Sequence, residues 1–563
     1  MTRRKSQLRR AFGQSPRLAT LAAAIAVAVP GAVQAFEIPT DNPDLAVRFD
    51  NTIRGNFAVR VESRDPKIGN SALADEGDYS FDNGKPVAER IDLLSELDVV
   101  YKKRFGFRTS GAAWYDAAYE SGNSKSNPNP PLVNIPSYIN NQYSDTTKRL
   151  YRGPNGEILD LFVFGGADLG DVPVNGKLGR HTIYWGESIL LGGHLHSVAY
   201  AQNPLDLQKG FATPGVEAKE LFRPLNQLSG QAQLTDTLSV AAQYMLEWSP
   251  ARYPEGGTYL GPVDFVFNGP DRQFLSPALG FATRGASSDP KQAGEYGLSA
   301  RWSPTWLDGT MGLYYRNFAD KLPQVLLTKA GPNISQYNLI YADDIDLYGA
   351  SITKNILGVS TSAEVSYRRN TPLSSQVLGV APGLPNAGDT KGARGDTWHA
   401  VANAIGTVAK TPVFDSASWI AELSASRWVV VRSGANLFNA IGYAPCNGKD
   451  KWDGCTTKNY AGIGLGFTPN WFQVFPGVDL SAPVTYAIGL TGNAATVFGG
   501  NQGLGNYSIG VGADVQQKYR FDLKYIDFLG RYKDNGTAVT SVNGLNTYLK
   551  DRGFMSLTFK TTF

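Results

Sequence analysis

The chain has few of the residues that mark several common protein classes. Its 563 residues include two cysteines and four histidines, and 18% are charged where about 25% is usual. Two cysteines exclude a dense disulfide framework. Behind residue 35 no apolar run reaches the roughly 18–20 residues of a membrane helix, which excludes a multi-pass helical protein. Glycine (61), tyrosine (27) and phenylalanine (27) are abundant, as is typical of a β-protein.

Residues 1–35 predict a secretory signal peptide. They carry six basic residues and no acidic one, and an apolar stretch over 18–29 precedes the small-residue cleavage site Val33-Gln34-Ala35. The remaining 47 basic and 50 acidic residues give the mature chain a net charge of about −3. The basic excess of the whole sequence therefore belongs to the signal, and no nucleic-acid partner is predicted.

Alternation of apolar and polar residues with period two runs along the mature chain. Over 45–62 the odd positions are apolar with few exceptions, whereas the even positions include Arg48, Asp50 and Arg54. Such alternation is typical of strands with two different faces. Eighteen such segments begin near residues 45, 90, 105, 158, 174, 226, 237, 294, 309, 344, 358, 396, 415, 461, 483, 506, 518 and 553.

The connections between these segments alternate between long and short. The long ones lie near 62–89, 120–157, 186–225, 249–293, 319–343, 370–395, 431–460, 491–505 and 533–552, and a turn of about fifteen residues at 468–482 is the longest of the others. This alternation of long and short connections predicts an all-β, transmembrane antiparallel β-barrel of about 18 strands (range 14–18). Its long connections would be extracellular loops and its short ones periplasmic turns. Residues 36–563 would then form a single outer-membrane β-barrel domain.

The C-terminus fits this prediction. Met555, Leu557 and Phe559 alternate with polar residues, and the last residue is Phe563. A final amphipathic strand that ends in an aromatic residue resembles the signal read by the outer-membrane barrel-assembly machinery. We therefore expect that machinery and outer-membrane lipid as partners.

Charged residues on the polar faces are expected to line a water-filled pore. Eighteen strands enclose an interior too wide for side chains to fill, and an Arg or Lys that faces lipid at mid-depth costs roughly 2–4 kcal/mol. The predicted pore-lining residues are Arg48, Asp50, Arg54, Arg60, Asp92, Glu96, Asp98, Arg108, Asp116, Glu364, Arg368, Asp514, Arg520, Asp522 and Lys524. Aromatic residues near strand ends suit interfacial girdles: Tyr101, Tyr115, Tyr119, Trp248, Trp302, Tyr315, Tyr367 and Tyr525.

Four stretches carry a family resemblance: Arg90–Asp98 (RIDLLSELD), Ser110–Asp116 (SGAAWYD), Gly179–Ser188 (GRHTIYWGES) and Pro214–Phe222 (PGVEAKELF). They resemble a family of Gram-negative outer-membrane β-barrel proteins catalogued as a domain of unknown function, over nearly all of the mature chain. The resemblance implies an outer-membrane location. Members are often encoded beside an RND-type (MMPL) exporter and a periplasmic partner, which implies a similar partnership and apolar or amphipathic cargo here.

The connection at 186–225 is the most unusual loop, because it lacks strand alternation and contains a mixed-charge stretch. We expect it to fold into the lumen and narrow the pore. Its charged residues would then meet opposite charges on the wall: Lys209, Glu217, Lys219, Glu220 and Arg223. The alternative is an ordered surface loop.

A strand-end motif precedes this loop, formed by Arg180, His181, Trp185, Glu187 and Ser188. Serine, histidine and glutamate invite a hydrolase hypothesis. However, the spacing does not by itself orient a base on a nucleophile, and no G-x-S-x-G element is present. We therefore assign no catalytic residue and expect a structural contact between Glu187 and Arg180.

The histidines and cysteines give two further expectations. His194 and His196 form an H-x-H pair without a neighbouring cysteine or carboxylate cluster, and His399 is isolated, so no metal and no cofactor is predicted. Cys446 and Cys455 share one long loop of an exported protein, which predicts a disulfide that staples the loop.

Three functional hypotheses remain. The first is an outer-membrane channel for small, apolar or amphipathic solutes that works with a periplasmic or inner-membrane partner. The second is an outer-membrane hydrolase centred on Ser188 and His181. The third is a structural or adhesion barrel whose long loops bind surface partners.

Overall fold

The computed structural model describes residues 36–129, 135–190, 196–212, 218–265, 267–330, 333–376, 378–381 and 385–563. The predicted signal peptide, residues 1–35, lies outside the described residues. Among the residues that are described, no helix is long and apolar enough to span a membrane.

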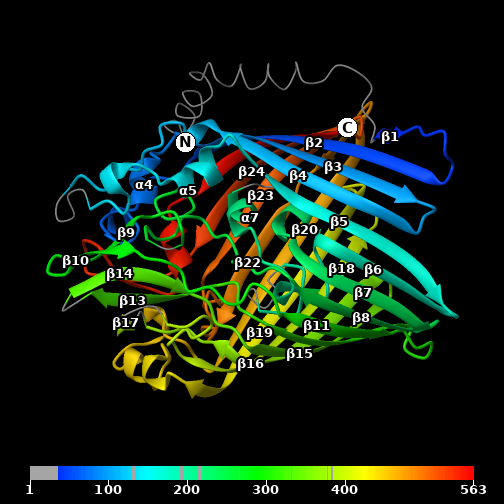
Figure 1. Ribbon diagram of the computed structural model, residues 1–563. Helices are drawn as coiled ribbons and strands as arrows, with labels where there is room; N and C mark the ends of the chain where they lie inside the picture. The colour runs from blue at the N-terminus through cyan, green and yellow to red at the C-terminus, as the bar shows by residue number, and fades with distance from the viewer. Residues whose placement is uncertain are drawn as a thin grey trace.

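Eighteen antiparallel strands form a closed barrel (Figure 1). Each strand pairs with the next in the chain, and β2 (Leu45–Arg60) pairs with β27 (Phe554–Thr562) to close the sheet. Between them follow β3 (Pro86–Tyr101), β4 (Phe105–Asp116), β5 (Asn155–Leu169), β6 (Val172–His181), β7 (Leu225–Thr235), β8 (Leu238–Met245), β11 (Tyr296–Trp302), β12 (Gly309–Phe318), β15 (Ile345–Ile356), β16 (Val359–Pro372), β18 (Arg394–Val408), β19 (Ser416–Ser433), β20 (Asn459–Phe475), β21 (Val478–Ser481) with β22 (Val484–Thr491), β23 (Gly505–Val515) and β24 (Tyr519–Leu529). The predicted fold class is confirmed.

Two details complete the sheet. β21 and β22 are two parts of one barrel strand, because both pair with β20 on one side and with β23 on the other. The short β1 (Phe36–Ile38) pairs with 47–49 of β2, beyond the point where β27 ends.

The connections sort by length, so the barrel has a turn end and a loop end. Turns such as 102–104, 170–171 and 357–358 alternate with connections such as 117–154 and 246–295, as predicted. The fifteen-residue turn expected at 468–482 is wrong. β20 continues to Phe475, and the chain reverses at Pro476-Gly477, where Gly477 has φ of +73°. Pro469 and the register shift between Trp471 and Phe475 interrupt the regular pairing of this hairpin, so the sequence did not predict these strand residues.

The long connections other than 182–224 build a cap over the loop end of the barrel, seen at the left of Figure 1. The cap contains a five-stranded sheet of β9 (Arg272–Ser276), β10 (Gly280–Arg284), β13 (Gln324–Ala330), β14 (Asn333–Ile340) and β17 (Leu378–Ala381), and a hairpin of β25 (Tyr532–Asp534) and β26 (Val539–Val542). Its helices are short: α3 (Pro66–Gly69), α4 (Glu76–Ser80) and α5 (Asp145–Thr147). Phe81, Tyr119 and Tyr259 belong to its buried aromatic cluster.

The barrel wall has two unlike faces. On β12, Leu313 is 63% exposed, whereas its neighbours Tyr314 and Arg316 are buried on the inner side. The same alternation along the other strands leaves an outer surface of Leu, Val, Ile and aromatic side chains. The polar inner row is covered in part by the segment that joins β6 to β7.

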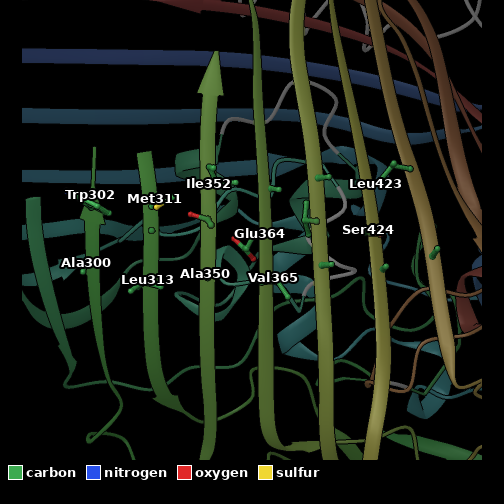
Figure 2. A pocket seen from close by; sticks show the side chains of 18 of the residues that line it. Ala300, Trp302, Met311, Leu313, Ala350, Ile352, Glu364, Val365, Leu423 and Ser424 are labelled. Carbon is green, nitrogen blue, oxygen red and sulfur yellow. The ribbon is translucent and has the colours of Figure 1, made fainter. Parts of the chain in front are cut away.

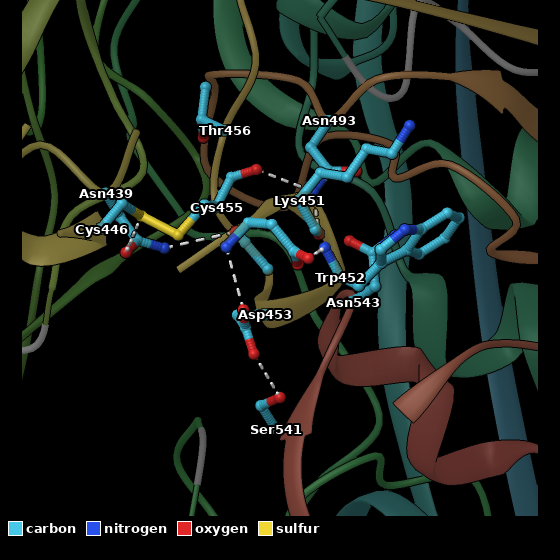
Figure 3. Close-up of a disulfide and its surroundings, with 12 residues drawn as sticks. Asn439, Cys446, Lys451, Trp452, Asp453, Cys455, Thr456, Asn493, Ser541 and Asn543 are labelled. Atoms are coloured by element: carbon cyan, nitrogen blue, oxygen red, sulfur yellow. Dashed lines mark hydrogen bonds between the residues drawn. A yellow bond between two sulfur atoms is a disulfide. The ribbon is translucent and has the colours of Figure 1, made fainter. Parts of the chain in front are cut away.

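The predicted disulfide between Cys446 and Cys455 is present in the cap (Figure 3). The amide of Asn493 donates to the carbonyl of Cys455 at 2.9 Å and to that of Lys451 at 2.7 Å. Asp453, within the stapled segment, accepts a hydrogen bond from Ser541 at 2.8 Å. The disulfide thus fixes a segment that contacts two other connections of the cap.

Candidate functional site

Segment 182–224, which joins β6 to β7, crosses the lumen to a distant part of the wall. The Glu364 carboxylate on β16 accepts hydrogen bonds from the backbone N–H groups of Glu187 and Val198, each at 2.8 Å. Six successive strand pairings separate β16 from β6. Hydrogen bonds to ionised acceptors are roughly twice as strong as neutral ones. Glu364, which is 4% exposed, is therefore a strong anchor for the segment.

A second wall carboxylate, Glu422 on β19, holds the same part of the segment. It accepts hydrogen bonds from the N–H groups of Ile189 at 2.6 Å and Leu190 at 3.2 Å, and from the Ser188 hydroxyl at 3.3 Å. Glu422 is fully buried. The segment supplies the backbone donors and the wall supplies the charge.

The later part of the segment lies against the opposite side of the barrel, near α7 (Leu207–Ala212) and α8 (Ala218–Leu221), and Figure 1 draws α7 between the two walls. Glu220 forms an ion pair with Arg54 of β2 at 2.6 Å, and both side chains are 4% exposed. Lys219 contacts Glu96 of β3, and Lys209 lies 3.6 Å from Glu157 of β5.

Arg223, which was also predicted to meet an opposite charge on the wall, binds neutral groups instead. Arg223 donates to the Ser249 hydroxyl at 3.1 Å and to the carbonyl of Pro250 at 2.8 Å, so its described partners are neutral. Burial lowers the pKa of the Arg223 guanidinium to about 10. Glu217 lies outside the described residues.

Most of the predicted pore-lining charges occur as ion pairs on the inner wall. The pairs are Arg48 with Asp50 (2.7 Å), Arg90 with Asp92 (2.8 Å), Arg108 with Asp98 (2.9 Å) and Arg520 with Asp522 (2.8 Å). Arg108 also contacts Glu96. Asp514 and Lys524 follow the same inward alternation on β23 and β24, and Arg368 donates to the carbonyl of Ser197 at 3.3 Å.

Two of these residues lie where the strands meet the cap. Arg60 is fully buried and pairs with Asp78 of the cap at 2.9 Å. Asp116 ends β4 and accepts a hydrogen bond from the N–H of Ala118 at 3.0 Å. Their contacts stabilise the junction between the barrel and the cap.

The strand-end motif is split between the two faces of the wall. Arg180 pairs with Glu247 at 3.1 Å, whereas Glu187 accepts a hydrogen bond from Ser351 at 3.0 Å. The expected contact between Glu187 and Arg180 is therefore wrong. Arg180 lies two residues after Leu178 on the same strand, so its side chain points to the outer face. The chain then turns into the lumen before it reaches Glu187, which places the two side chains on opposite sides of the wall.

The remaining residues of the motif have separate partners. His181 Nε2 lies 2.8 Å from the Ser229 hydroxyl, whereas Ser188 donates to Glu422. The ring centroid of Trp185 lies 6.5 Å from that of Tyr314. The structure thus does not bring His181 and Ser188 together.

The histidines form a stacked pair rather than a ligand cluster. His196 and His399 are buried, with ring centroids 5.7 Å apart. His194 lies outside the described residues. No group of three or more His, Cys, Asp or Glu suited to a metal ion occurs in the described part of the chain.

Several residues that hold the segment were not among those predicted from the sequence. Glu422 was detectable, because it falls on the polar face of the strand expected from residue 415. Glu157, whose carboxylate binds Arg252 at 2.6 Å, lies at the start of β5, just before the predicted strand. Arg252 also pairs with Asp206 of the segment at 2.9 Å.

A shallow apolar groove of about 1040 Å³ crosses the outer face of the wall from β11 to β20 (Figure 2). Small residues such as Ala300, Ala350 and Ala402 form its floor, and Leu313 and Leu423 stand beside them. The groove lies across the wall from the inner row that contains Glu364. Nothing in it is charged on the outer side.

The cap also holds buried carboxyl groups, which are hydrogen-bonded to backbone N–H groups of the cap itself. Asp264 accepts a hydrogen bond from the N–H of Glu76 at 3.2 Å, and Asp75 accepts one from Asn127 at 2.6 Å. Burial raises the pKa of Asp264 to about 7. Burial and the neighbouring Asp264 charge raise the pKa of Asp75 to about 8.

These features define a closed eighteen-strand β-barrel with a connecting segment bound inside its lumen. The chain belongs to the family described as "Protein of unknown function (DUF1302)", whose model matches residues 17–563. No curated protein matches the sequence significantly.

Several solved structures are similar to this chain at low sequence identity. They include OccAB2 of Acinetobacter baumannii (11% identity, 92% of this chain and 98% of that chain, TM-score 0.39) and OpdK of Pseudomonas aeruginosa with vanillate (9%, 92% and 98%, 0.40). OccD3 (OpdP) of Pseudomonas aeruginosa is also similar (12%, 96% of each chain, 0.38).

Proposed function

We propose that this protein is an outer-membrane channel through which small solutes pass between segment 182–224 and the barrel wall. The observation that carries the proposal is the attachment of this segment to two distant parts of the wall, through Glu364 and Glu422 on one side and Arg54 on the other. A barrel of this width cannot be filled by its own side chains. A segment bound across it restricts the passage without filling it.

The outer surface supports a membrane location. Leu298, Leu313 and Ile509 are each more than half exposed, and water would be a poor solvent for so much apolar surface. Acyl chains cover such a surface without the cost of apolar hydration, and each strand of the closed sheet is hydrogen-bonded to a neighbour on both sides, so the sheet has no open edge.

A row of aromatic side chains marks one boundary of the apolar surface. Tyr315, Tyr348, Tyr367 and Trp398 are direct cross-strand neighbours on the outer face of β12–β18. Such rows lie at the lipid headgroups in membrane barrels. Tyr119 and Trp248, which were expected in a girdle, are instead buried in the cap.

Location and partners follow from the same proposal. The chain would be exported by its signal peptide to the outer membrane of a Gram-negative cell and inserted by the barrel-assembly machinery through the strand that ends at Phe563. An RND-type exporter and a periplasmic partner would supply apolar or amphipathic cargo; this part rests on the family resemblance.

The other two hypotheses have less support. A hydrolase would need His181 to reach Ser188, but each is hydrogen-bonded to another residue. Adhesion would require the cap to bind another molecule. Its contacts through Arg60, Asn493 and Asp453 all join parts of this protein to one another. We therefore propose a channel without enzymatic activity.

Purified protein in planar lipid bilayers tests the proposal. We expect stepwise single-channel conductance in KCl, and uptake of small neutral sugars into liposomes with a sharp size limit. Ser188→Ala and His181→Ala should conduct like the wild type. A folded, inserted barrel without conductance would contradict the proposal.

A further inference from the structure

The lumen contains a cavity on the turn side of segment 182–224. Its volume is about 460 Å³, and it lies between residues 182–185 and the inner faces of β5 to β11. Its lining includes Phe164, Lys177, Tyr184, Trp185 and Arg301. Residues 182–185 of the segment form one side of this cavity, so a solute that passes the segment beside β5 to β11 meets it.

The charge of this cavity has one sign. Lys177 and Arg301 are exposed in it, and neither forms an ion pair with any described residue. None of the residues that line the cavity is acidic. Other arginines of the inner wall are paired with carboxylates, as Arg54 is with Glu220 and Arg316 is with Glu295 at 2.8 Å.

The surface between the two cations is neutral and rich in hydrogen-bonding groups. Lys177 is the cross-strand neighbour of Ser229, and Arg301 is that of Ser239. Asn175 and Gln231 face each other on the same inner row. An anionic group can therefore be solvated by neutral donors while it moves between the cations.

Aromatic rings complete the site. Tyr184 is 53% exposed, and its ring packs edge-on against Phe222 with centroids 5.3 Å apart, which fixes this side of the cavity. Trp185 packs near Tyr314, and Phe164 is the cross-strand neighbour of Lys177. Rings beside unpaired cations suit a molecule with a flat apolar body and an anionic group.

We propose that this cavity binds small organic anions with an aromatic body, such as aromatic carboxylates. The inference deepens the proposed channel function and rests on it: Lys177 and Arg301 attract the anionic group, and Tyr184 and Trp185 contact the rings. Neutral analogues of the same shape lose the charge-assisted contacts and bind more weakly.

Binding of 1-naphthoate to the detergent-solubilised barrel, measured by titration calorimetry, tests this site. We expect Lys177→Gln with Arg301→Gln to weaken binding about tenfold or more, because each lost contact is a hydrogen bond to a charged group. A matched control, Lys103→Gln with Lys410→Gln, removes two exposed cations at the turn end and should bind like the wild type. Neutral 1-naphthamide should bind weakly to all three proteins.

Unchanged 1-naphthoate affinity in the Lys177 and Arg301 variant, or equally tight binding of 1-naphthamide, would overturn the site. Bilayer recordings on the same preparations separate this result from failure of the channel. A conducting barrel that 1-naphthoate neither binds nor blocks would refute the site alone. Cation-dependent binding to a barrel without conductance would support the site and refute the channel.

Discussion

The two walls that hold segment 182–224 do so by different chemistry. On β16 and β19, buried carboxylates accept hydrogen bonds from backbone N–H groups of the segment. On β2, β3 and β5, wall side chains form ion pairs with side chains of the segment. Four of the five donors in the first attachment are backbone N–H groups, so it depends little on which side chains the segment carries, whereas the second attachment fails when either partner changes.

The largest effect is expected from removing both carboxylate anchors. Glu364→Ala with Glu422→Ala leaves five donors without their acceptor, and each hydrogen bond to a charged group contributes roughly 1.5–3 kcal/mol. We expect the segment to detach from β16 and β19, so that single-channel conductance rises several-fold and becomes noisy.

Asp168→Ala is the matched control, because this carboxylate pairs with Arg104 at the turn end, outside the lumen. It should leave conductance unchanged. Conductance of the double variant at the wild-type level would show that the segment does not depend on these anchors.

A smaller effect is expected on the opposite wall. Arg54→Ala leaves Glu220 buried without its partner, which costs roughly 3–5 kcal/mol. Thermal unfolding of the barrel should shift to lower temperature, with a partial rise in conductance. Arg54→Glu combined with Glu220→Arg should recover much of the loss, and a charge swap that recovers none would contradict a direct ion pair.

The pH dependence of the cap extends the comparison, because Asp75 and Asp264 are also carboxylates bound to backbone N–H groups. Their raised pKa values, about 8 and about 7, mean that the folded cap holds protons which the unfolded chain releases near pH 4. Stability from these groups is therefore full below about pH 4, is lost progressively as the pH rises from 4 towards 7 and 8, and changes little above pH 8.

We expect hydrogen exchange of residues 61–85 to increase between pH 5 and pH 8 and to level off above pH 8, after correction for the intrinsic exchange rate. Each carboxyl can change the opening equilibrium by at most about tenfold per pH unit. Asp264→Asn should flatten this dependence. A pH-independent cap would argue against protonated carboxyls there.

The smallest effect on the lumen is expected from the disulfide. Cys446→Ser with Cys455→Ser removes a constraint that contributes roughly 2.5–3 kcal/mol in the chain-entropy model. Protease sensitivity should increase within 434–458, whereas conductance should stay at the wild-type value. A changed conductance would show that the cap and segment 182–224 are coupled.

The barrel was predictable because every strand separates apolar lipid-facing positions from polar inner ones. All eighteen predicted starts lie within about four residues of an observed strand start. The five-stranded sheet of the cap was not predicted, since β9 and β10 are only five residues each and are partly covered by other connections, so neither strand has one apolar and one polar face.

The site was predictable only where it depends on side chains of opposite charge. The contact of Glu220 with Arg54 needs two charged residues, and both are visible in the sequence. The anchors at Glu364 and Glu422 use backbone N–H groups, which every residue but proline carries, so no sequence pattern marks their partners. Arg180 was paired wrongly because its partner, Glu247, lies far along the chain, directly after β8, the second strand after β6.

The central claim is that the apolar face of the wall meets lipid while the polar face encloses water. Single cysteines at Leu298, which faces outward, and at Gln231, which faces inward, test it in reconstituted vesicles, since Cys446 and Cys455 are paired. A charged, membrane-impermeant thiol reagent should modify the Gln231→Cys variant and spare Leu298→Cys. Equal reactivity of the two variants, or the reverse order, would contradict the account.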